Sequence, residues 1–254
     1  MQAHPPAPDV PARPDTVSPD EIARFGRLAD RWWDPAGPMR PLHQMNPLRI
    51  GWADRHLAPL RVAHPDRPLR LLDLGCGAGL ASEGLADLGY DVLGVDASAE
   101  AIDAARAHAA LGSPGRKLAY RAGTAEALLA EGLGFDAITA LEVIEHVPDP
   151  AAFLGLLARL LNPRGLVILS TLNRTWRSLA TAKIGAEYVL RLLPAGTHDW
   201  RRFITPAELA RHAAAAGLRV VDIAGMVPSL PGRIDRWRES RDLGVNYIAA
   251  LSGD

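Results

Sequence analysis

The sequence predicts an α/β protein built on a doubly wound, mostly parallel β-sheet. From Pro68 onward, short apolar runs that end in Gly or Asp alternate with amphipathic stretches rich in Ala and Leu. Such regular alternation is typical of parallel strands joined by right-handed helical crossovers. The first run leads into a glycine-rich turn and the second ends in Asp96, which marks one edge of the sheet as the expected ligand site.

Seven apolar runs have the length and the boundaries of strands. They are Leu69–Leu74, Asp91–Val95, Leu118–Ala122, Ala137–Leu141, Leu166–Ser170, Arg219–Ala224 and Tyr247–Leu251. Helices are expected between them over Gly79–Leu88, Ala99–Ala110, Ala125–Glu131, Pro150–Leu161 and Pro206–Ala216. Only the loop from Gly225 to Val245 separates the last two runs, so the last strand is expected to enter antiparallel, as part of a long hairpin.

The first 67 residues differ in character from the rest. Six prolines and few residues that could pack predict a disordered tail over residues 1–19. Ser18 to Glu21 has the pattern of a helix start, and a second helix is expected over Pro47 to Leu60. Between them, Trp32 to His43 is expected to be ordered but irregular. Residues 20–67 should thus form a helical cover on a single domain that spans residues 20–254.

The composition excludes several classes of protein. The 28 basic and 29 acidic residues leave a net charge of −1, which disfavours a nucleic-acid partner. A single Cys excludes a disulfide framework and any zinc site that needs several thiolates, and it predicts a reducing compartment. No run approaches the ~18 apolar residues of a spanning helix, and Met1 to Asp20 lack an apolar signal core. We therefore expect a cytoplasmic location.

The glycine-rich turn, Asp73-Leu74-Gly75-Cys76-Gly77-Ala78-Gly79, is the most informative segment. A dinucleotide-binding turn requires G-x-G-x-x-G, but here the third Gly comes one residue early and Leu80 takes its place. Asp96 follows Gly79 by 17 residues, where a carboxylate can accept hydrogen bonds from two ribose hydroxyls. Backbone groups and Asp73 can meet an ammonium group. Together these features indicate S-adenosylmethionine (SAM), bound by Asp73, Gly75, Gly77 and Asp96, with Thr124 beside the adenine.

A second cluster, Glu142, Glu145 and His146, follows the fourth expected strand. On a helical turn the i, i+3 and i+4 spacing places the three side chains on one face. They could then hold Mg²⁺, Mn²⁺, Zn²⁺ or Fe²⁺. Alternatively, the glutamates cap backbone amides, and the His packs against its neighbours or acts as a base. The sequence leaves both interpretations open.

These residues resemble those of a known family. The turn Asp73–Gly79 with Asp96 is similar to the signature of class I SAM-dependent methyltransferases. Further segments resemble the ubiquinone biosynthesis O-methyltransferases, and the resemblance runs from Glu21 to Leu251. The segments are Arg31–Asp34, Pro41–Arg49, Glu145–Pro150, Ser170–Arg174, Gly185–Tyr188 and Gly196–Trp200.

The resemblance implies a Rossmann-like sheet of seven strands, with the last antiparallel. It implies methylation of a 2-polyprenyl-6-hydroxyphenol and a 3-demethylubiquinol, and association with other enzymes of ubiquinone biosynthesis. By the same resemblance, Arg49, Gly75, Asp96 and Leu141 contact SAM. Mg²⁺ is implied at the residues that we also expect to be catalytic, namely Glu142, Glu145 and His146. Two departures, Gln44-Met45 and Leu141, concern the fit of the substrate more than the type of reaction.

The expected reaction is an in-line attack of a phenolate on the sulfonium methyl group. Phenols ionise at a pKa of about 10, so the proton must be made easier to remove. A metal ion that chelates both catechol oxygens can do this, or His146 can accept the proton. We favour the metal for catechol-like substrates. A methyltransferase for another small molecule, and an inactive SAM-binding module, remain as alternatives.

A polyprenylated substrate predicts contact with membrane lipid. Residues 173–203 are expected to be an inserted lid, and residues 174–193 divide into two arcs at helical spacing. The apolar arc contains Leu179, Ala182, Ala186, Val189, Leu190 and Leu193. The polar arc contains Arg177, Lys183, Glu187 and Arg191. This composition is typical of an interfacial helix, although a lid helix that faces the core has the same pattern. We expect peripheral binding at the inner face of the membrane.

Overall fold

A computed structural model describes Ser18, residues 22–23, Gly26, and residues 31–37, 39–112, 114–180, 200–230 and 233–253. The expected tail, apart from Ser18, lies outside the described residues, as does most of the helix expected after it. The expected membrane-contact segment falls largely on residues 181–199, which are also outside them.

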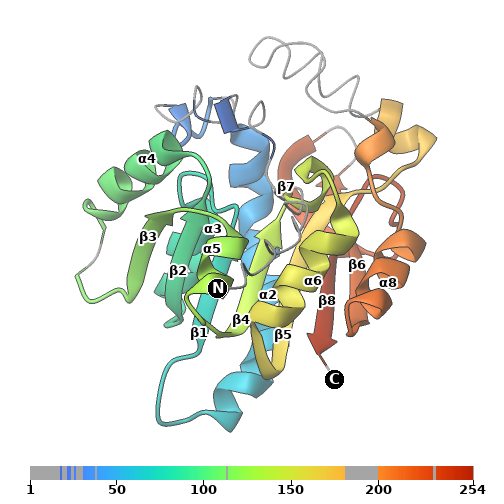
Figure 1. Cartoon of the computed structure of the whole chain (residues 1–254). Coiled ribbons are helices and arrows are strands. Elements are labelled where there is room, and N and C mark those ends of the chain that lie inside the picture. The colour runs from blue at the N-terminus through green and yellow to red at the C-terminus, as the bar shows by residue number, and fades with distance from the viewer. Residues whose placement is uncertain are drawn as a thin grey trace, which may run out of the picture.

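An eight-stranded sheet with the order β3-β2-β1-β4-β5-β8-β6-β7 forms the centre of the molecule (Figure 1). The first five strands run parallel, whereas β8 is antiparallel to both of its neighbours, β5 and β6. The strands are β1 Arg70–Leu74, β2 Asp91–Asp96, β3 Leu118–Ala122, β4 Phe135–Leu141, β5 Leu161–Leu172, β6 Leu218–Leu230, β7 Arg233–Ser240 and β8 Asn246–Gly253. The doubly wound, mostly parallel sheet and the antiparallel last strand are therefore confirmed.

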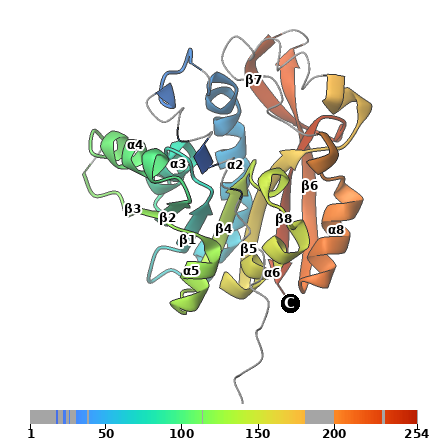
Figure 2. The ribbon, with the colours of Figure 1, turned by 45° about the horizontal axis from the view of Figure 1, so that its top comes forward.

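Helices cover both faces of the sheet (Figures 1 and 2). One face carries α2 Arg40–Ala63, α3 Leu80–Asp87 and α4 Ala99–Ala109, and the other carries α5 Ala125–Ala130, α6 Pro150–Leu160 and α8 Pro206–Ala215. Alternate strand residues point to opposite faces. Ile168 and Ile248 accordingly pack with Trp52 of α2, while Val167 and Ala249 pack with Leu157 of α6. Five of these helices begin and end within one residue of the prediction.

The predicted count of seven strands is too low by one. β7, which pairs antiparallel with β6, lies within the segment that was expected to be a loop. It is the edge strand, and charged side chains at the edge of a sheet protect it against unwanted pairing. The exposed charged residues of β7, which include Arg236, Arg238 and Glu239, interrupt the apolar run by which a strand is recognised. Trp237 nevertheless packs against the core.

Among the starts of the elements, those of α2 and β5 differ most from the prediction. α2 begins at Arg40, seven residues before the expected Pro47, and it contains both Pro47 and Pro59. Pro41 stands in the first turn, where its missing N–H has no helical partner to lose. β5 begins at Leu161, five residues before the expected Leu166. The added residues contain an irregularity, since Arg164 has a φ of 65° and the β4–β5 register shifts.

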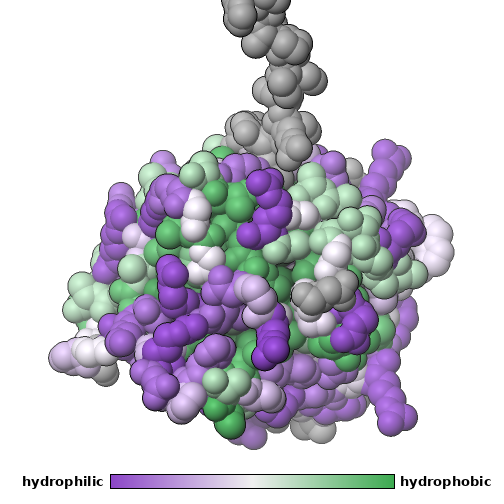
Figure 3. Space-filling view, turned by 60° about the horizontal axis from the view of Figure 1, so that its bottom comes forward, coloured by the Kyte–Doolittle hydropathy of each residue, from purple (hydrophilic) through white to green (hydrophobic). Residues whose placement is uncertain are grey.

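The outer surface mixes hydrophilic and hydrophobic residues, as seen from the edge opposite to the carboxyl ends of the parallel strands (Figure 3). Large exposed hydrophobic side chains in the described residues belong to separate segments: Val62, Leu88, Leu111, Trp176 and Val221. No helix within the described residues has the length and apolar character needed to cross a bilayer.

Candidate active site

The glycine-rich turn joins β1 to α3 at the carboxyl edge of the sheet. Gly75 has a φ of 73°, and Gly77 has a φ of 54°, which are left-handed values that glycine adopts without strain. The Gly75 N–H donates to the Val95 carbonyl at 2.7 Å, which ties the turn to β2. A Cβ at Gly75 would lie 2.5 Å from Val143 Cγ2, so the turn lies directly against the segment that follows β4.

Asp96, the last residue of β2, organises the turn with its carboxylate. One oxygen accepts a hydrogen bond from the Gly77 N–H at 2.8 Å, and the other accepts from the Ser98 N–H at 2.9 Å. Burial raises the pKa of Asp96, while the amide hydrogen bonds oppose that rise. An ionised carboxylate has about four acceptor positions. Asp96 therefore keeps some capacity to accept a hydrogen bond from a ligand hydroxyl.

Asp73 lies beneath the turn and is buried. Ser82 Oγ donates to one of its oxygens at 2.5 Å, and Thr139 Oγ1 donates to the other at 2.7 Å. Burial raises the pKa of Asp73 above its usual value. These bonds link β1 to α3 and β4, so Asp73 holds the turn in place.

Arg49 of α2 brings a buried positive charge to the same edge. Its side chain is 3% exposed, and it donates to Asn46 Oδ1 at 3.2 Å. Burial lowers the pKa of Arg49, and the charges of Glu142 and Asp73 oppose this. Its Nε has no hydrogen-bond partner. A buried guanidinium with a free donor is suited to an anionic ligand group such as a carboxylate.

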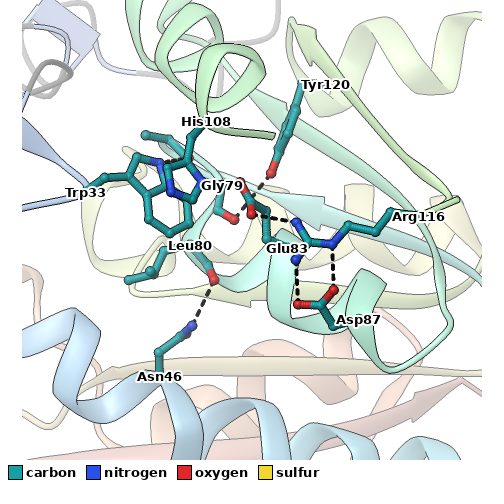
Figure 4. Close-up of polar contacts among 10 residues, drawn as sticks. Trp33, Asn46, Gly79, Leu80, Glu83, Asp87, His108, Arg116 and Tyr120 are labelled. Carbon is teal, nitrogen blue, oxygen red and sulfur yellow. Dashed lines mark hydrogen bonds and ion pairs between the residues drawn. The ribbon is translucent and has the colours of Figure 1, made fainter. Parts of the chain in front are cut away.

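The N-terminal cover is fastened to the turn by contacts that the sequence did not indicate (Figure 4). Trp33 Nε1 donates to the Ala78 carbonyl at 3.0 Å, and Asn46 Nδ2 donates to the Leu80 carbonyl at 2.8 Å. The Trp33 ring stacks on His108 with centroids 3.3 Å apart.

His108 is in turn held from α3. Its Nδ1 lies 2.7 Å from Glu83 Oε1, and the second oxygen of Glu83 accepts from Arg116 at 2.8 Å (Figure 4). The segment around Trp33, α2 and α4 thus meet around the start of α3. The only sequence signal for this arrangement is the aromatic character of Trp32-Trp33.

Glu142, Glu145 and His146 do not lie on an α-helical turn, contrary to the prediction. Glu142 has a φ of 58° and precedes the short 3₁₀ helix η2 Ile144–His146, so no α-helical turn carries the cluster. Ser170 Oγ donates to Glu142 at 2.7 Å, and Thr171 Oγ1 donates to Glu145 at 2.8 Å. Because Ser170 and Thr171 are consecutive in β5, they point to opposite faces of the sheet. The two carboxylates therefore bind different hydroxyls, although the charge of Glu142 still raises the pKa of Glu145.

The predicted metal site at Glu142, Glu145 and His146 is not supported by this geometry. Across residues 39–112 and 114–180 and the other described parts, no three His, Cys, Asp or Glu side chains are grouped so that they could hold a metal ion. Each glutamate has its hydroxyl partner from β5 instead. In the alternative interpretation the glutamates cap backbone amides, whereas here they accept hydrogen bonds from side-chain hydroxyls. The role of His146 as a base stays a prediction.

Glu145 is 3% exposed, and its ionisation is expected to weaken the fold. Burial first, and the charge of Glu142 second, raise the pKa of Glu145 to about 8. Since this value lies above that of an unfolded glutamate, stability is highest at low pH and falls as pH rises toward 8. We expect Glu145→Gln to remove this dependence: the free energy of unfolding of the variant should exceed that of the wild type increasingly between pH 5 and 8.5. Denaturant titrations at several pH values measure it, and parallel curves for both proteins would contradict it.

The two remaining predicted contacts lie at the same edge. Thr124 is the N-cap of α5, where its Oγ1 accepts from the Ala127 N–H at 3.4 Å, and the neighbouring Gly123 N–H donates to the Asp96 carbonyl at 2.9 Å. Leu141 is the last residue of β4 and is half-buried. The structure thus brings every predicted cofactor residue to the carboxyl edge of β1 to β4, while their contacts with SAM stay a prediction.

Gly77 offers a test of how tightly the turn is packed. A Cβ there would overlap the Trp32 ring, and Ala in the left-handed region is itself strained. We expect Gly77→Ala to lower the free energy of unfolding by at least about 2 kcal/mol and to weaken SAM binding. Gly155→Ala is the matched control, because a Cβ in the middle of α6 meets nothing within 4 Å. It should raise stability by about 0.5 to 1 kcal/mol, and equal effects of the two substitutions would contradict the account.

Comparisons with known proteins are consistent with one another. The family model "Methyltransferase domain" matches residues 49–223. The "Ubiquinone biosynthesis O-methyltransferase" of Azorhizobium caulinodans is 48% identical and aligns over 92% of each chain. The protein of the same name from Dinoroseobacter shibae is 47% identical over 92% of this chain and 96% of that one.

A solved structure shares the fold at lower sequence identity. It is the magnesium protoporphyrin IX methyltransferase (ChlM) from Synechocystis PCC 6803 with bound S-adenosylhomocysteine (SAH). It is 21% identical, covers 92% of this chain and 100% of its own, and has a TM-score of 0.65. This likeness concerns the arrangement of the sheet and helices.

Proposed function

The chain belongs to the family of ubiquinone biosynthesis O-methyltransferases, and on this premise we propose that it methylates phenolic hydroxyls of polyprenylated ubiquinone precursors. It is a SAM-dependent methyltransferase. The proposed substrates are a 2-polyprenyl-6-hydroxyphenol and a 3-demethylubiquinol. The observation that supports the proposal is the packing of Val143 against Gly75, because His146 follows Val143 by three residues in the segment after β4.

The cofactor residues have separate tasks in this proposal. Asp96 accepts hydrogen bonds from the ribose hydroxyls of SAM. Arg49 offers its free Nε to the methionine carboxylate. The turn at Gly75 and Gly77, closed by Trp32 and Trp33, lets the backbone approach the ligand. Bound in this way, SAM would present its methyl group to the space next to the segment that follows β4.

Methyl transfer then requires only that an oxygen attacks in line with the carbon–sulfur bond. The neutral imidazole of His146 accepts the proton of the phenol, the oxygen forms its bond to the methyl carbon, and the carbon–sulfur bond breaks. The products are the aryl methyl ether, SAH and a protonated imidazole. Placement of the two reactants supplies much of the acceleration, and proton removal by a positioned base contributes about 10² to 10⁴. No step passes through a metal ion.

An assay with short-chain analogues tests this function. Purified protein, SAM and a 3-prenylcatechol should yield the methyl ether and SAH in equal amounts, and a prenylated demethylquinol should react as well. Extensive treatment with a chelator should change kcat less than twofold. Absence of the ether would reject the substrate class, whereas loss of activity that returns with Mg²⁺ would restore the metal interpretation.

We also propose that residues 173–203 contact membrane lipid and act as a lid. Trp176 is 78% exposed and stacks on Trp200 with ring centroids 5.8 Å apart, so two indoles flank residues 181–199. Indole side chains favour the interface between lipid and water. This arrangement supports the expectation that the substrate is taken from a bilayer.

Trp176→Ala is therefore expected to reduce binding to vesicles. At low salt, the fraction that sediments with anionic liposomes should fall at least threefold, while activity on a water-soluble short-chain catechol stays within twofold. Val62→Ala is a matched control, because Val62 is equally exposed but lies in α2. Wild-type protein that does not sediment with liposomes would contradict the proposal.

A further inference from the structure

Asn246, the first residue of β8, carries a buried amide oxygen without a partner. Its side chain is 5% exposed. The amide nitrogen contacts Met45 Sδ at 3.7 Å, and Oδ1 has no hydrogen-bond partner. Buried polar atoms in native proteins nearly always have a partner, so one that lacks it needs an explanation. A ligand hydroxyl is one such partner.

The position of Asn246 favours this explanation. In the antiparallel ladder Asn246 stands opposite Leu172, and the side chains of such a pair lie on the same face of the sheet. Ser170, which donates to Glu142, precedes Leu172 by two residues in β5 and therefore shares its face. Two residues along a strand span roughly 7 Å.

The contact with α2 places Asn246 relative to the cofactor residues. Met45 lies one helical turn before Arg49, which faces the charges of Glu142 and Asp73. Asn246 thus lies between the sheet and α2, on the same side as Arg49 and Glu142. It belongs to the carboxyl edge of β5, next to the place where the methyl group would be presented.

We propose that Asn246 is a specificity-determining residue that recognises the hydroxyl next to the one that is methylated. The inference rests on the proposed function. An amide oxygen can accept from an O–H group and cannot donate, which suits the second hydroxyl of a catechol or quinol. The thioether of Met45 and the side chain of Leu172 would border the aromatic ring beside it. A substrate without the second hydroxyl leaves Oδ1 unpaired, and a site built for such a hydrogen bond discriminates strongly against it.

The test compares a short-chain 3-prenylcatechol with the corresponding 3-prenylphenol, which keeps the hydroxyl that is methylated and lacks the neighbouring one. Wild-type protein should prefer the catechol at least 100-fold in kcat/KM. Asn246→Leu, which removes the oxygen but keeps the volume, should reduce this preference at least tenfold, mainly through a higher KM for the catechol. The affinity of the SAH complex for the catechol, measured by calorimetry, should fall by a similar factor, and the affinity for SAM should stay within twofold.

Asn162→Leu is the matched control. Asn162 lies at the other end of β5, where its Nδ2 donates to Asp136 at 2.9 Å. This variant should lose thermal stability and keep the preference for the catechol. A wild-type protein that does not distinguish the two compounds overturns the inference without any variant, as does an Asn246→Leu protein with an unchanged preference. Failure of wild-type protein to methylate either compound would instead refute the proposed function.

Discussion

Asp96→Ala is expected to weaken SAM binding about 100-fold. The carboxylate would make two charge-assisted hydrogen bonds to the ribose, each worth about 1.5 to 3 kcal/mol. A loss of about 3 kcal/mol corresponds to two factors of ten in Kd. Asp96 also holds the Gly77 and Ser98 amides, so the turn itself should loosen in the variant. Calorimetric titration with SAM and with SAH measures the effect.

Asp103→Ala serves as the control for this experiment. Asp103 lies on α4, is largely exposed and pairs with Arg106 at 3.4 Å. Its substitution should leave the Kd for SAM within twofold of the wild-type value. A Kd for Asp96→Ala that differs from the control by less than fivefold would show that the ribose does not lie at the end of β2.

His146→Ala is expected to lower kcat by 10² to 10⁴ without a comparable change in SAM affinity, since this is the range for loss of a positioned base. The defect should depend on pH. As pH rises toward the phenolic pKa of about 10, the substrate ionises without help, so the ratio of wild-type to variant kcat should shrink. A pH profile between 6.5 and 9.5 separates this role from a structural one.

His64→Ala is the control for the loss of an imidazole, because His64 is exposed at the end of α2. It should change kcat less than twofold at every pH. A His146→Ala protein whose activity resembles that of this control would exclude His146 as the base. A defect that is constant across the pH range would mean that His146 only positions other groups.

The parts of the fold that were predicted correctly are those that depend on residue patterns within a short stretch of sequence. Each parallel strand is a short apolar run, and amphipathic stretches rich in Ala and Leu alternate with these runs. The glycine-rich turn and Asp96 could also be placed, because strand, turn and helix follow one another without interruption. Because β2 and β4 run parallel in one sheet, Asp96 at the end of β2 and Leu141 at the end of β4 lie at the same edge.

Other features depend on contacts between distant segments, which no local pattern contains. The spacing of Glu142, Glu145 and His146 suggested a shared helical face, but Glu142 precedes a 3₁₀ helix, and the two glutamates accept hydrogen bonds from Ser170 and Thr171 of β5. The stack of Trp33 on His108 joins residues 75 positions apart. β7 was missed for a different reason, since an exposed edge needs charge and so loses the alternation that would identify it.

Transfer of a labelled methyl group tests the central claim most directly. Purified protein is incubated with SAM that carries ¹³C in its methyl group and with a short-chain 3-prenylcatechol, and the product is examined by NMR. The account predicts that the label appears in an aryl methyl ether, next to the intact second hydroxyl. Label on a ring carbon would contradict it. A protein that binds SAM but transfers no label to the catechol would contradict it as well.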